Sequence, residues 1–248
     1  MSEQKAAQRL CGLMRKAVQD YEMLAPGDRV LVGVSGGKDS VALTMGLALL
    51  RQYIGFDFEI QAVTLDPQFG GKATDYAPLE ELFAKLEVPF EIRRSNIGAV
   101  VFDVRKEPNP CALCAKMRRG LLHDTAKELG CNKVALGHHL DDAIETFYMN
   151  LWGEGRLGCF SPVTYLSRKD LTMIRPMILA TESDVRRAVN HESLPVVKSA
   201  CPADGATRRQ EMKEYVADMC RKDRAFRQKM LGAMQGADLD GWAPVAKG

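Results

Sequence analysis

A short loop of small and charged residues follows an apolar run, and its residue types suit phosphate binding. Two glycines let the backbone approach a ligand closely, and the free N–H groups of a helix start attract anions. Two serine hydroxyls and one lysine add further donors. The pattern predicts a phosphate-binding loop, and a loop that binds released pyrophosphate suits cleavage of ATP between its α and β phosphates. The apolar run is Val30 to Val34, and the loop is Ser35-Gly36-Gly37-Lys38-Asp39-Ser40.

The loop differs from a Walker A loop. The spacing from Gly33 to Lys38 is one residue too short, and Asp39 stands where Ser or Thr belongs. A glycine-rich turn without a ligand is the alternative, but the whole hexapeptide between a strand and a helix favours a nucleotide. The predicted nucleotide-binding residues are Val34, Ser35, Gly36, Gly37, Lys38, Asp39, Ser40, Leu65 and Gly137.

A second polar motif follows another predicted strand and opens another predicted helix. It reads Leu136-Gly137-His138-His139-Leu140-Asp141-Asp142. Acids in a first helical turn suit the helix dipole, so simple capping is one explanation. At the same sheet edge as the phosphate loop, however, Asp141 and Asp142 could hold Mg²⁺ against ATP phosphates. We expect His138 to contact phosphate or substrate, and we consider Glu145 a weaker candidate.

Two cysteines one helical turn apart, Cys111 and Cys114, begin the predicted helix Ala112 to Leu129. Such a pair is compatible with a metal or cluster, a redox couple, or chance. A four-cysteine zinc site is poorly supported because the chain has no second C-x-x-C. Four other cysteines have no motif context, and small buried hydrophobes are their simplest interpretation: Cys11, Cys131, Cys159 and Cys220.

The phosphate loop resembles the signature of the N-type ATP pyrophosphatase, or PP-loop, superfamily. That resemblance implies an α/β fold related to the adenine-nucleotide α-hydrolases, with ATP at the carboxyl ends of the strands. Within this group the chain resembles the tRNA 2-thiocytidine synthetase family from about Leu24 to Cys220. The matching segments are Pro110 to Leu122, with its C-x-x-C-x-x-x-R-R-G pattern, Ala135 to Asp142, and Ile174-Arg175-Pro176.

The family resemblance implies a [4Fe–4S] cluster held by three cysteines, which leaves one iron open. Two ligands map onto Cys111 and Cys114, and Cys201 is the only cysteine in the region of the third. The chain departs from the family pattern because Cys201 lacks the second C-x-x-C that many members carry. It is also shorter than many members at its C-terminus, and both departures bear on the identity of the substrate.

The function implied is ATP-dependent thiolation of a tRNA anticodon-loop cytidine at position 32. ATP, Mg²⁺ and the cluster are the expected cofactors; tRNA and a sulfur donor, such as a cysteine desulfurase or sulfide, are the expected partners. A homodimer is a compatible assembly. The alternatives are a thiolase acting on another RNA base or a small molecule, a lysidine-type tRNA ligase, and a non-catalytic nucleotide or iron–sulfur sensor. The expected catalytic residues are Lys38, Asp39, His138, Asp141 and Asp142.

Alternating strands and helices predict a doubly wound parallel sheet of five strands. We expect an N-terminal helix over 1–24, an ATP pyrophosphatase domain over 25–205 and a helical C-terminal tail over 206–248. One long charged helix is predicted from Ala206 to Met234, followed by loosely held residues. The stretch from Gly153 to Ser167 is predicted to be a loop. The expected strands are Val30 to Val34, Phe58 to Leu65, Phe90 to Arg94, Lys133 to Leu136 and Leu171 to Arg175.

The composition is that of an ordinary globular protein. The 248 residues carry a net charge of only +2, which neither requires nor excludes a nucleic-acid partner. No apolar run is long enough to span a bilayer, and the start of the chain lacks a signal-peptide layout. We therefore expect a cytoplasmic protein with no disulfide framework. The scattered arginine doublets, Arg118-Arg119 among them, could bind RNA, but solvated helix faces explain each one equally well.

Overall fold

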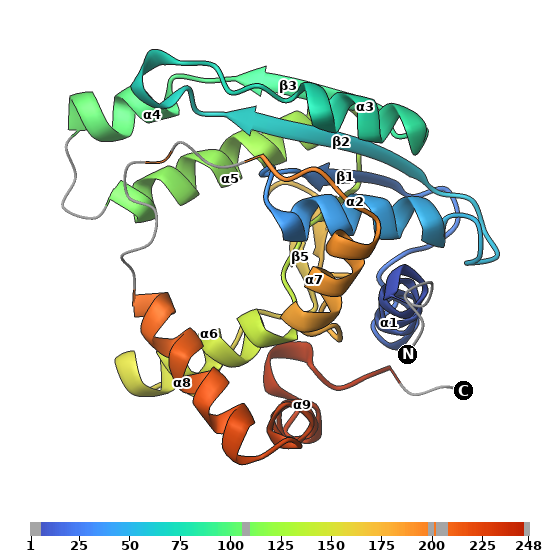
Figure 1. Ribbon diagram of the computed structural model, residues 1–248, viewed down its shortest axis with the longest axis vertical. Coiled ribbons are helices and arrows are strands. Elements are labelled where there is room, and N and C mark those ends of the chain that lie inside the picture. The colour runs from blue at the N-terminus through green and yellow to red at the C-terminus, as the bar shows by residue number, and fades with distance from the viewer. Residues whose placement is uncertain (1–5, 106–109, 198–200, 202–207, 246–248) are drawn as a thin grey trace.

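The computed structural model describes residues 6–105, 110–197, 201 and 208–245. Its centre is a six-stranded sheet of order β3-β2-β1-β4-β6-β5, with helices on both faces (Figure 1). Five strands pair in parallel, and β5 runs antiparallel to β6 at one edge. This confirms the predicted doubly wound α/β class. The strands are β1 Arg29–Gly33, β2 Glu59–Asp66, β3 Phe90–Arg94, β4 Lys133–Ala135, β5 Val163–Leu166 and β6 Leu171–Ile174.

The sheet has one strand more than the five that the sequence predicts. The extra strand, β5, lies in the stretch predicted to be a loop, so that prediction is wrong over its last part. A tight turn joins β5 to β6, in which the Lys169 N–H donates to the Leu166 carbonyl at 3.0 Å. No residue of β5 is fully buried, because it is an edge strand. An edge strand therefore lacks the continuous apolar run that marks the central strands.

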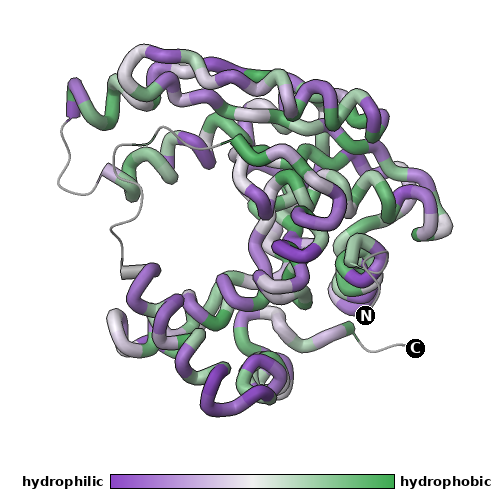
Figure 2. The backbone as a smooth tube through the Cα atoms, in the orientation of Figure 1, coloured by the Kyte–Doolittle hydropathy of each residue, from purple (hydrophilic) through white to green (hydrophobic). Residues whose placement is uncertain are grey.

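The sheet separates two apolar cores, and alternate residues of β1 point into each. Val30 and Val32 belong to the larger core, which α1, α2 and α7 cover, whereas Leu31 belongs to a smaller core beneath α5. Helix α2 is largely apolar and buried, whereas the outer helix α8 is mostly hydrophilic (Figure 2). The helices and short helical turns are α1 Ala6–Asp20, α2 Lys38–Leu50, η2 Phe69–Gly71, α3 Ala77–Lys85, α4 Ile97–Ala99, η3 Val100–Arg105, α5 Pro110–Glu128, α6 Leu140–Gly153, α7 Glu182–His191, α8 Arg208–Lys222, α9 Phe226–Gly236 and η4 Leu239–Gly241.

The C-terminal part differs from the single long helix predicted for it. Two helices, α8 and α9, pack against α6. The break between them is stabilised by Asp223, whose side chain accepts from the Ala225 N–H at 2.8 Å. Side-chain capping of this kind offers the backbone an alternative to continuing the helix. A charged sequence with helical periodicity on both sides hides such a break.

The end of the chain is held more firmly than the sequence predicts. Trp242 is fully buried, and its indole Nε1 donates to the Phe160 carbonyl at 3.1 Å. The Tyr21 hydroxyl donates to the Trp242 carbonyl at 3.1 Å, which ties this segment to the end of α1. The prediction of a loosely held end is therefore wrong for the described residues up to 245. One buried tryptophan in a short segment leaves no periodic pattern in the sequence.

The connections of the sheet place its topological switch point between β1 and β4. From β1 the chain moves outward to β2 and β3, then returns to β4 on the other side of β1 and continues to β6. Ligands of open α/β sheets bind beyond the carboxyl ends of the strands at such a point. The phosphate loop follows β1 and the histidine–acid motif follows β4, so both lie at this crevice. Within the described residues, no helix is long and apolar enough to cross a bilayer.

Candidate active site

Hydrogen bonds hold the phosphate loop in a tight turn between β1 and α2. The Ser35 N–H donates to Ser40 Oγ at 3.1 Å, and Ser40 Oγ donates to the Gly37 carbonyl at 2.9 Å. Gly36 has a φ of +85°, a left-handed conformation that favours glycine. Its carbonyl accepts from the Val197 N–H at 2.9 Å. Gly37 begins α2 without a side-chain cap, so the helix start is open to an anion.

Lys38 lies between two carboxylates. Its Nζ is 2.9 Å from Asp39 Oδ1 and 3.2 Å from Glu182 Oε1. Although burial disfavours the charged amine, these carboxylates raise the pKa of Lys38. Burial alone would raise the pKa of Glu182, but hydrogen bonds and charges from Lys213 and Lys38 lower it to about 2. Lys38 is thus a fixed cation beside the helix start, although it does not line the pocket described next.

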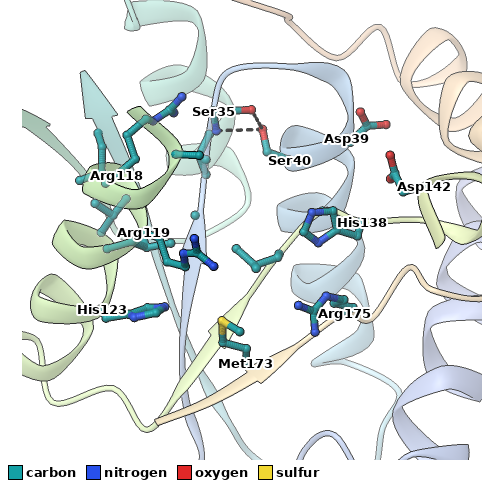
Figure 3. Close-up of a pocket in the computed structure, with 18 residues that line it drawn as sticks. Ser35, Asp39, Ser40, Arg118, Arg119, His123, His138, Asp142, Met173 and Arg175 are labelled. Carbon is teal, nitrogen blue, oxygen red and sulfur yellow. Dashed lines mark hydrogen bonds between the residues drawn. The ribbon is translucent and has the colours of Figure 1, made fainter. Parts of the chain in front are cut away.

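A pocket of about 600 Å³ lies at the carboxyl edge of the sheet, between the phosphate loop and α5 (Figure 3). It contains most of the residues predicted to bind the nucleotide or act on the substrate. Gly36, Gly37, Lys38 and Asp141 are outside its lining. The lining residues are Gly33, Val34, Ser35, Asp39, Ser40, Val63, Leu65, Ala115, Arg118, Arg119, Leu122, His123, Leu136, Gly137, His138, Asp142, Met173 and Arg175.

The histidine–acid motif packs directly on the phosphate loop. A Cβ added at Gly137 would lie 3.1 Å from the Asp39 carbonyl carbon, so a glycine permits this close approach. His139 caps α6: its Nδ1 accepts from the Asp142 N–H at 3.3 Å, and its N–H donates to Asp142 Oδ2 at 2.9 Å. Its Nε2 lies 3.7 Å from Asp39 Oδ1. Asp39 and Asp142, from two neighbouring strand ends, thereby share one wall of the pocket.

Asp141 occupies a different place from the one the sequence predicts. Its carboxylate is buried, pairs with Arg227 of α9 at 2.6 Å, and accepts from the Glu182 N–H at 2.8 Å. It thus ties α6 to α7 and α9 instead of facing the loop. The predicted pair Asp141 and Asp142 is replaced at the pocket by Asp39 and Asp142. Glu145 is likewise buried and outside the lining.

Sequence reasoning missed the basic residues that α5 and β6 bring into the pocket. In the sequence Arg118 and Arg119 are one of several scattered doublets, yet both line the pocket from α5. Arg119 and Arg175 enter it from opposite sides (Figure 3). His123, one helical turn beyond Arg119, is buried there too. Helical periodicity from the C-x-x-C pair was the available signal, because residues three or four apart share one face of a helix.

Cys114 is influenced electrostatically by the other two predicted cluster ligands. Burial raises the pKa of Cys114, the positive charge of Arg118 lowers it, and the negative charges of Cys201 and Cys111 raise it. Cys111 is exposed, while Cys114 and Cys201 are half-buried. Ala115, the residue after Cys114, lines the pocket. The helix that bears the C-x-x-C pair therefore lies beside the phosphate loop, and Cys201 is close enough to act on Cys114 by its charge.

Within the described ranges, no three His, Cys, Asp or Glu side chains converge to hold one metal ion. Two of the remaining thiols, Cys131 and Cys159, are more deeply buried than the three predicted cluster ligands. Burial raises the pKa of Cys159 to about 12.

Comparison with known proteins gives a consistent family match. A PP-loop domain family matches residues 4–219. The tRNA-cytidine(32) 2-sulfurtransferase of Syntrophotalea carbinolica is 35% identical over 235 residues, covering 94% of this chain and 90% of the relative. The enzyme of the same name from Pelobacter propionicus is 35% identical over 237 residues, covering 94% and 87%.

Among solved structures, the U34-tRNA thiolase NcsA from Methanococcus maripaludis, determined with its [4Fe–4S] cluster, has a TM-score of 0.76 and 22% identity. The match covers 91% of this chain and 76% of that one. An NMN synthetase from Francisella tularensis has a TM-score of 0.50 and 16% identity, covering 88% and 87%. At these identities the structural matches establish a shared fold.

Proposed function

Because the chain belongs to the tRNA-cytidine(32) 2-sulfurtransferase family of PP-loop proteins, we propose that it converts cytidine 32 of tRNA to 2-thiocytidine, using ATP. One observation carries the proposal beyond family membership. The phosphate loop and the helix that bears the C-x-x-C pair line the same pocket, through Ser35 and Ser40 on one side and Ala115 and Arg118 on the other. Such a pocket can activate a base and receive a sulfur nucleophile without releasing the base.

The first step we propose is adenylation of the base. The C2 carbonyl oxygen of the cytidine attacks the α-phosphorus of ATP, and the bond to pyrophosphate breaks. Ser35, Ser40 and the open N-terminus of α2 bind the departing pyrophosphate, and Lys38 neutralises its charge. Lys38 must exchange a carboxylate partner for phosphate when ATP binds. Its two present ion pairs keep the amine charged and close to the loop.

Mg²⁺ fits the acidic wall formed by Asp39 and Asp142. Magnesium is commonly bound by one or two carboxylates together with substrate phosphates. Two carboxylates without a third protein ligand therefore agree with a site completed by ATP. The ion would supply positive charge for the developing pyrophosphate. His138, in the same lining, is placed to contact the phosphate or the base.

The second step is replacement of the activated oxygen. A sulfide equivalent attacks C2 of the base, and AMP leaves with the former carbonyl oxygen. Cys111, Cys114 and Cys201 would hold a [4Fe–4S] cluster, which supplies an iron with an open position for sulfur. Arg118 is the basic neighbour that favours the thiolate form of Cys114. We propose sulfide as the sulfur source, supplied directly or released by a thiol reductant from the persulfide of a cysteine desulfurase.

A turnover assay with anaerobically purified protein tests this function. We expect AMP and pyrophosphate to form together when ATP, sulfide and a cytidine-32 tRNA transcript are all present. A matched transcript with uridine at position 32 should give no AMP above background. Equal turnover of the two transcripts would refute cytidine 32 as the substrate. Incorporation of an amine in place of sulfur would instead identify a lysidine-type ligase.

A further inference from the structure

Arg175 is a buried arginine that reaches the pocket wall from the end of β6. Its relative exposure is only 5%, yet it lines the pocket together with His138 and Ser35. Its Nη1 donates to the Ser161 carbonyl at 2.5 Å and lies 3.3 Å from Thr164 Oγ1. Its Nε is buried and has no hydrogen-bond partner among the described residues.

The charge of Arg175 is not balanced by the part of the chain that the structure describes. Its hydrogen bonds go to neutral oxygens, and no carboxylate there lies within ion-pair distance of it. The ring of Phe160 lies 4.9 Å from its guanidinium carbon and also packs on His138. Burial lowers the pKa of Arg175 to about 10, so it remains charged at neutral pH. A buried charge without a counterion carries a large desolvation penalty, so a site of this kind favours the binding of an anion.

Strand register places Arg175 near the level of the phosphate loop. Val32 of β1 pairs with Ala135 of β4, which pairs with Ile174 of β6. Arg175 therefore leaves β6 at the level where β1 ends and the loop begins. Two strand spacings, roughly 10 Å, separate β1 from β6. The Arg175 side chain extends across part of this distance. The remainder leaves room for one phosphate next to a pyrophosphate bound by the loop.

We propose that Arg175 binds the α-phosphate of ATP and continues to hold the same phosphate in the adenylated base and in AMP. The proposal rests on the ATP-dependent function proposed above. It assigns different sites to the two products, because the loop binds pyrophosphate and Arg175 binds the adenylyl group. The unpaired Nε and the guanidinium fork match the geometry of phosphate oxygens. A phosphate of the tRNA backbone offers the same chemistry, so the test separates the two sources.

Calorimetry with the full chain can measure the binding of AMP, pyrophosphate and tRNA separately. For Arg175→Met we expect AMP affinity to fall about 10- to 100-fold, the loss of charge-assisted hydrogen bonds. Pyrophosphate and tRNA affinities should remain at the wild-type values. Arg168→Met is the matched control, because Arg168 is exposed on the turn between β5 and β6 and should leave all three affinities unchanged.

A second variant and the outcomes that would contradict the proposal complete the test. Arg175→Lys keeps the charge but lacks the fork, so AMP affinity should still fall and pyrophosphate affinity should not; this variant serves if Arg175→Met does not fold. Wild-type affinity for AMP in either folded variant overturns the proposal. A loss confined to tRNA assigns the residue to an RNA phosphate and overturns it as well. If wild-type protein bound neither ATP nor AMP, the proposed function itself would fail.

Discussion

Lys38 shows how one residue of the loop combines a structural and a chemical role. The sequence predicts a phosphate-binding lysine, and the structure adds that Asp39 and Glu182 already position its amine. Glu182 could not be predicted, since it belongs to α7 and meets the loop only through the fold. Asp141 shows the opposite case. Its position next to Asp142 predicts a metal ligand, but its carboxylate instead forms an ion pair with Arg227, which is remote in the sequence.

Replacing Lys38 tests the loop assignment. We expect Lys38→Ala to lower ATP turnover by at least about tenfold, because a charge-assisted contact to phosphate is lost. The variant should still fold with only a modest drop in melting temperature, because Lys38 is only partly buried and Lys213 still pairs with Glu182. Lys85→Ala, at the exposed end of α3, is the matched control and should retain full turnover. Wild-type pyrophosphate release from Lys38→Ala would disprove the assignment.

The low pKa of Glu182 leads us to predict how the free energy of unfolding depends on pH in acid. Its pKa falls from 4.5 to about 2 in the folded chain, so its stabilising contribution is full above pH 4.5 and is lost as the pH drops towards 2. The difference in unfolding free energy between wild type and Glu182→Gln should therefore shrink over that interval. Urea titrations at several pH values measure it, with Glu80→Gln as the exposed control. A difference independent of pH would show that the ion pairs do not act as described.

At the level of elements, the strands and helices that carry motifs were predictable because their apolar runs and caps are local. The edge strand β5 and the break between α8 and α9 were not, because neither has a strong local pattern. The relation between elements was partly predictable. Parallel strands gather their following loops at one sheet edge, which places the histidine–acid motif beside the phosphate loop. How α5 lies across that edge, with Arg118 and Arg119 in the pocket, required the structure.

Helix α5 and Cys201 give the next prediction, which concerns the cluster. Anaerobically purified protein should hold roughly four irons per chain. Replacing Cys111, Cys114 or Cys201 by Ala should remove most of this iron and abolish thiolation, while ATP binding survives. Cys220→Ala should keep its iron, because that half-buried thiol lies on α8 outside the group. Full iron content in Cys201→Ala would exclude this residue as the third ligand.

At the scale of the whole molecule, the last described residues support the site from outside the pocket. Trp242 bonds to the carbonyl of Phe160, whose ring packs on His138 and Arg175. Asp240 accepts from the adjacent Cys159 N–H at 2.8 Å. No sequence pattern predicts the hydrogen bond between Trp242 and Phe160, because it joins residues that lie 82 positions apart in the chain. The C-terminal segment thus supports the pocket without lining it.

Removing the buried tryptophan should be costly. We expect Trp242→Ala to lower the free energy of unfolding by about 3–5 kcal/mol, the usual effect of emptying a large aromatic site. The half-exposed Val245 offers a control three residues away, and Val245→Ala should stay within about 0.5 kcal/mol. Chemical denaturation measures both. Equal stability of the two variants would mean that the C-terminal segment contributes nothing to the fold.

Mass spectrometry of tRNA nucleosides from cells that lack this protein tests the central claim most directly. The account predicts that 2-thiocytidine disappears while other thiolated nucleosides keep their levels. A plasmid with the wild-type chain should restore it, whereas one with Cys114→Ala should not. Unchanged 2-thiocytidine in the deletion strain, or the selective loss of a different thiolated nucleoside, would contradict thiolation of cytidine 32.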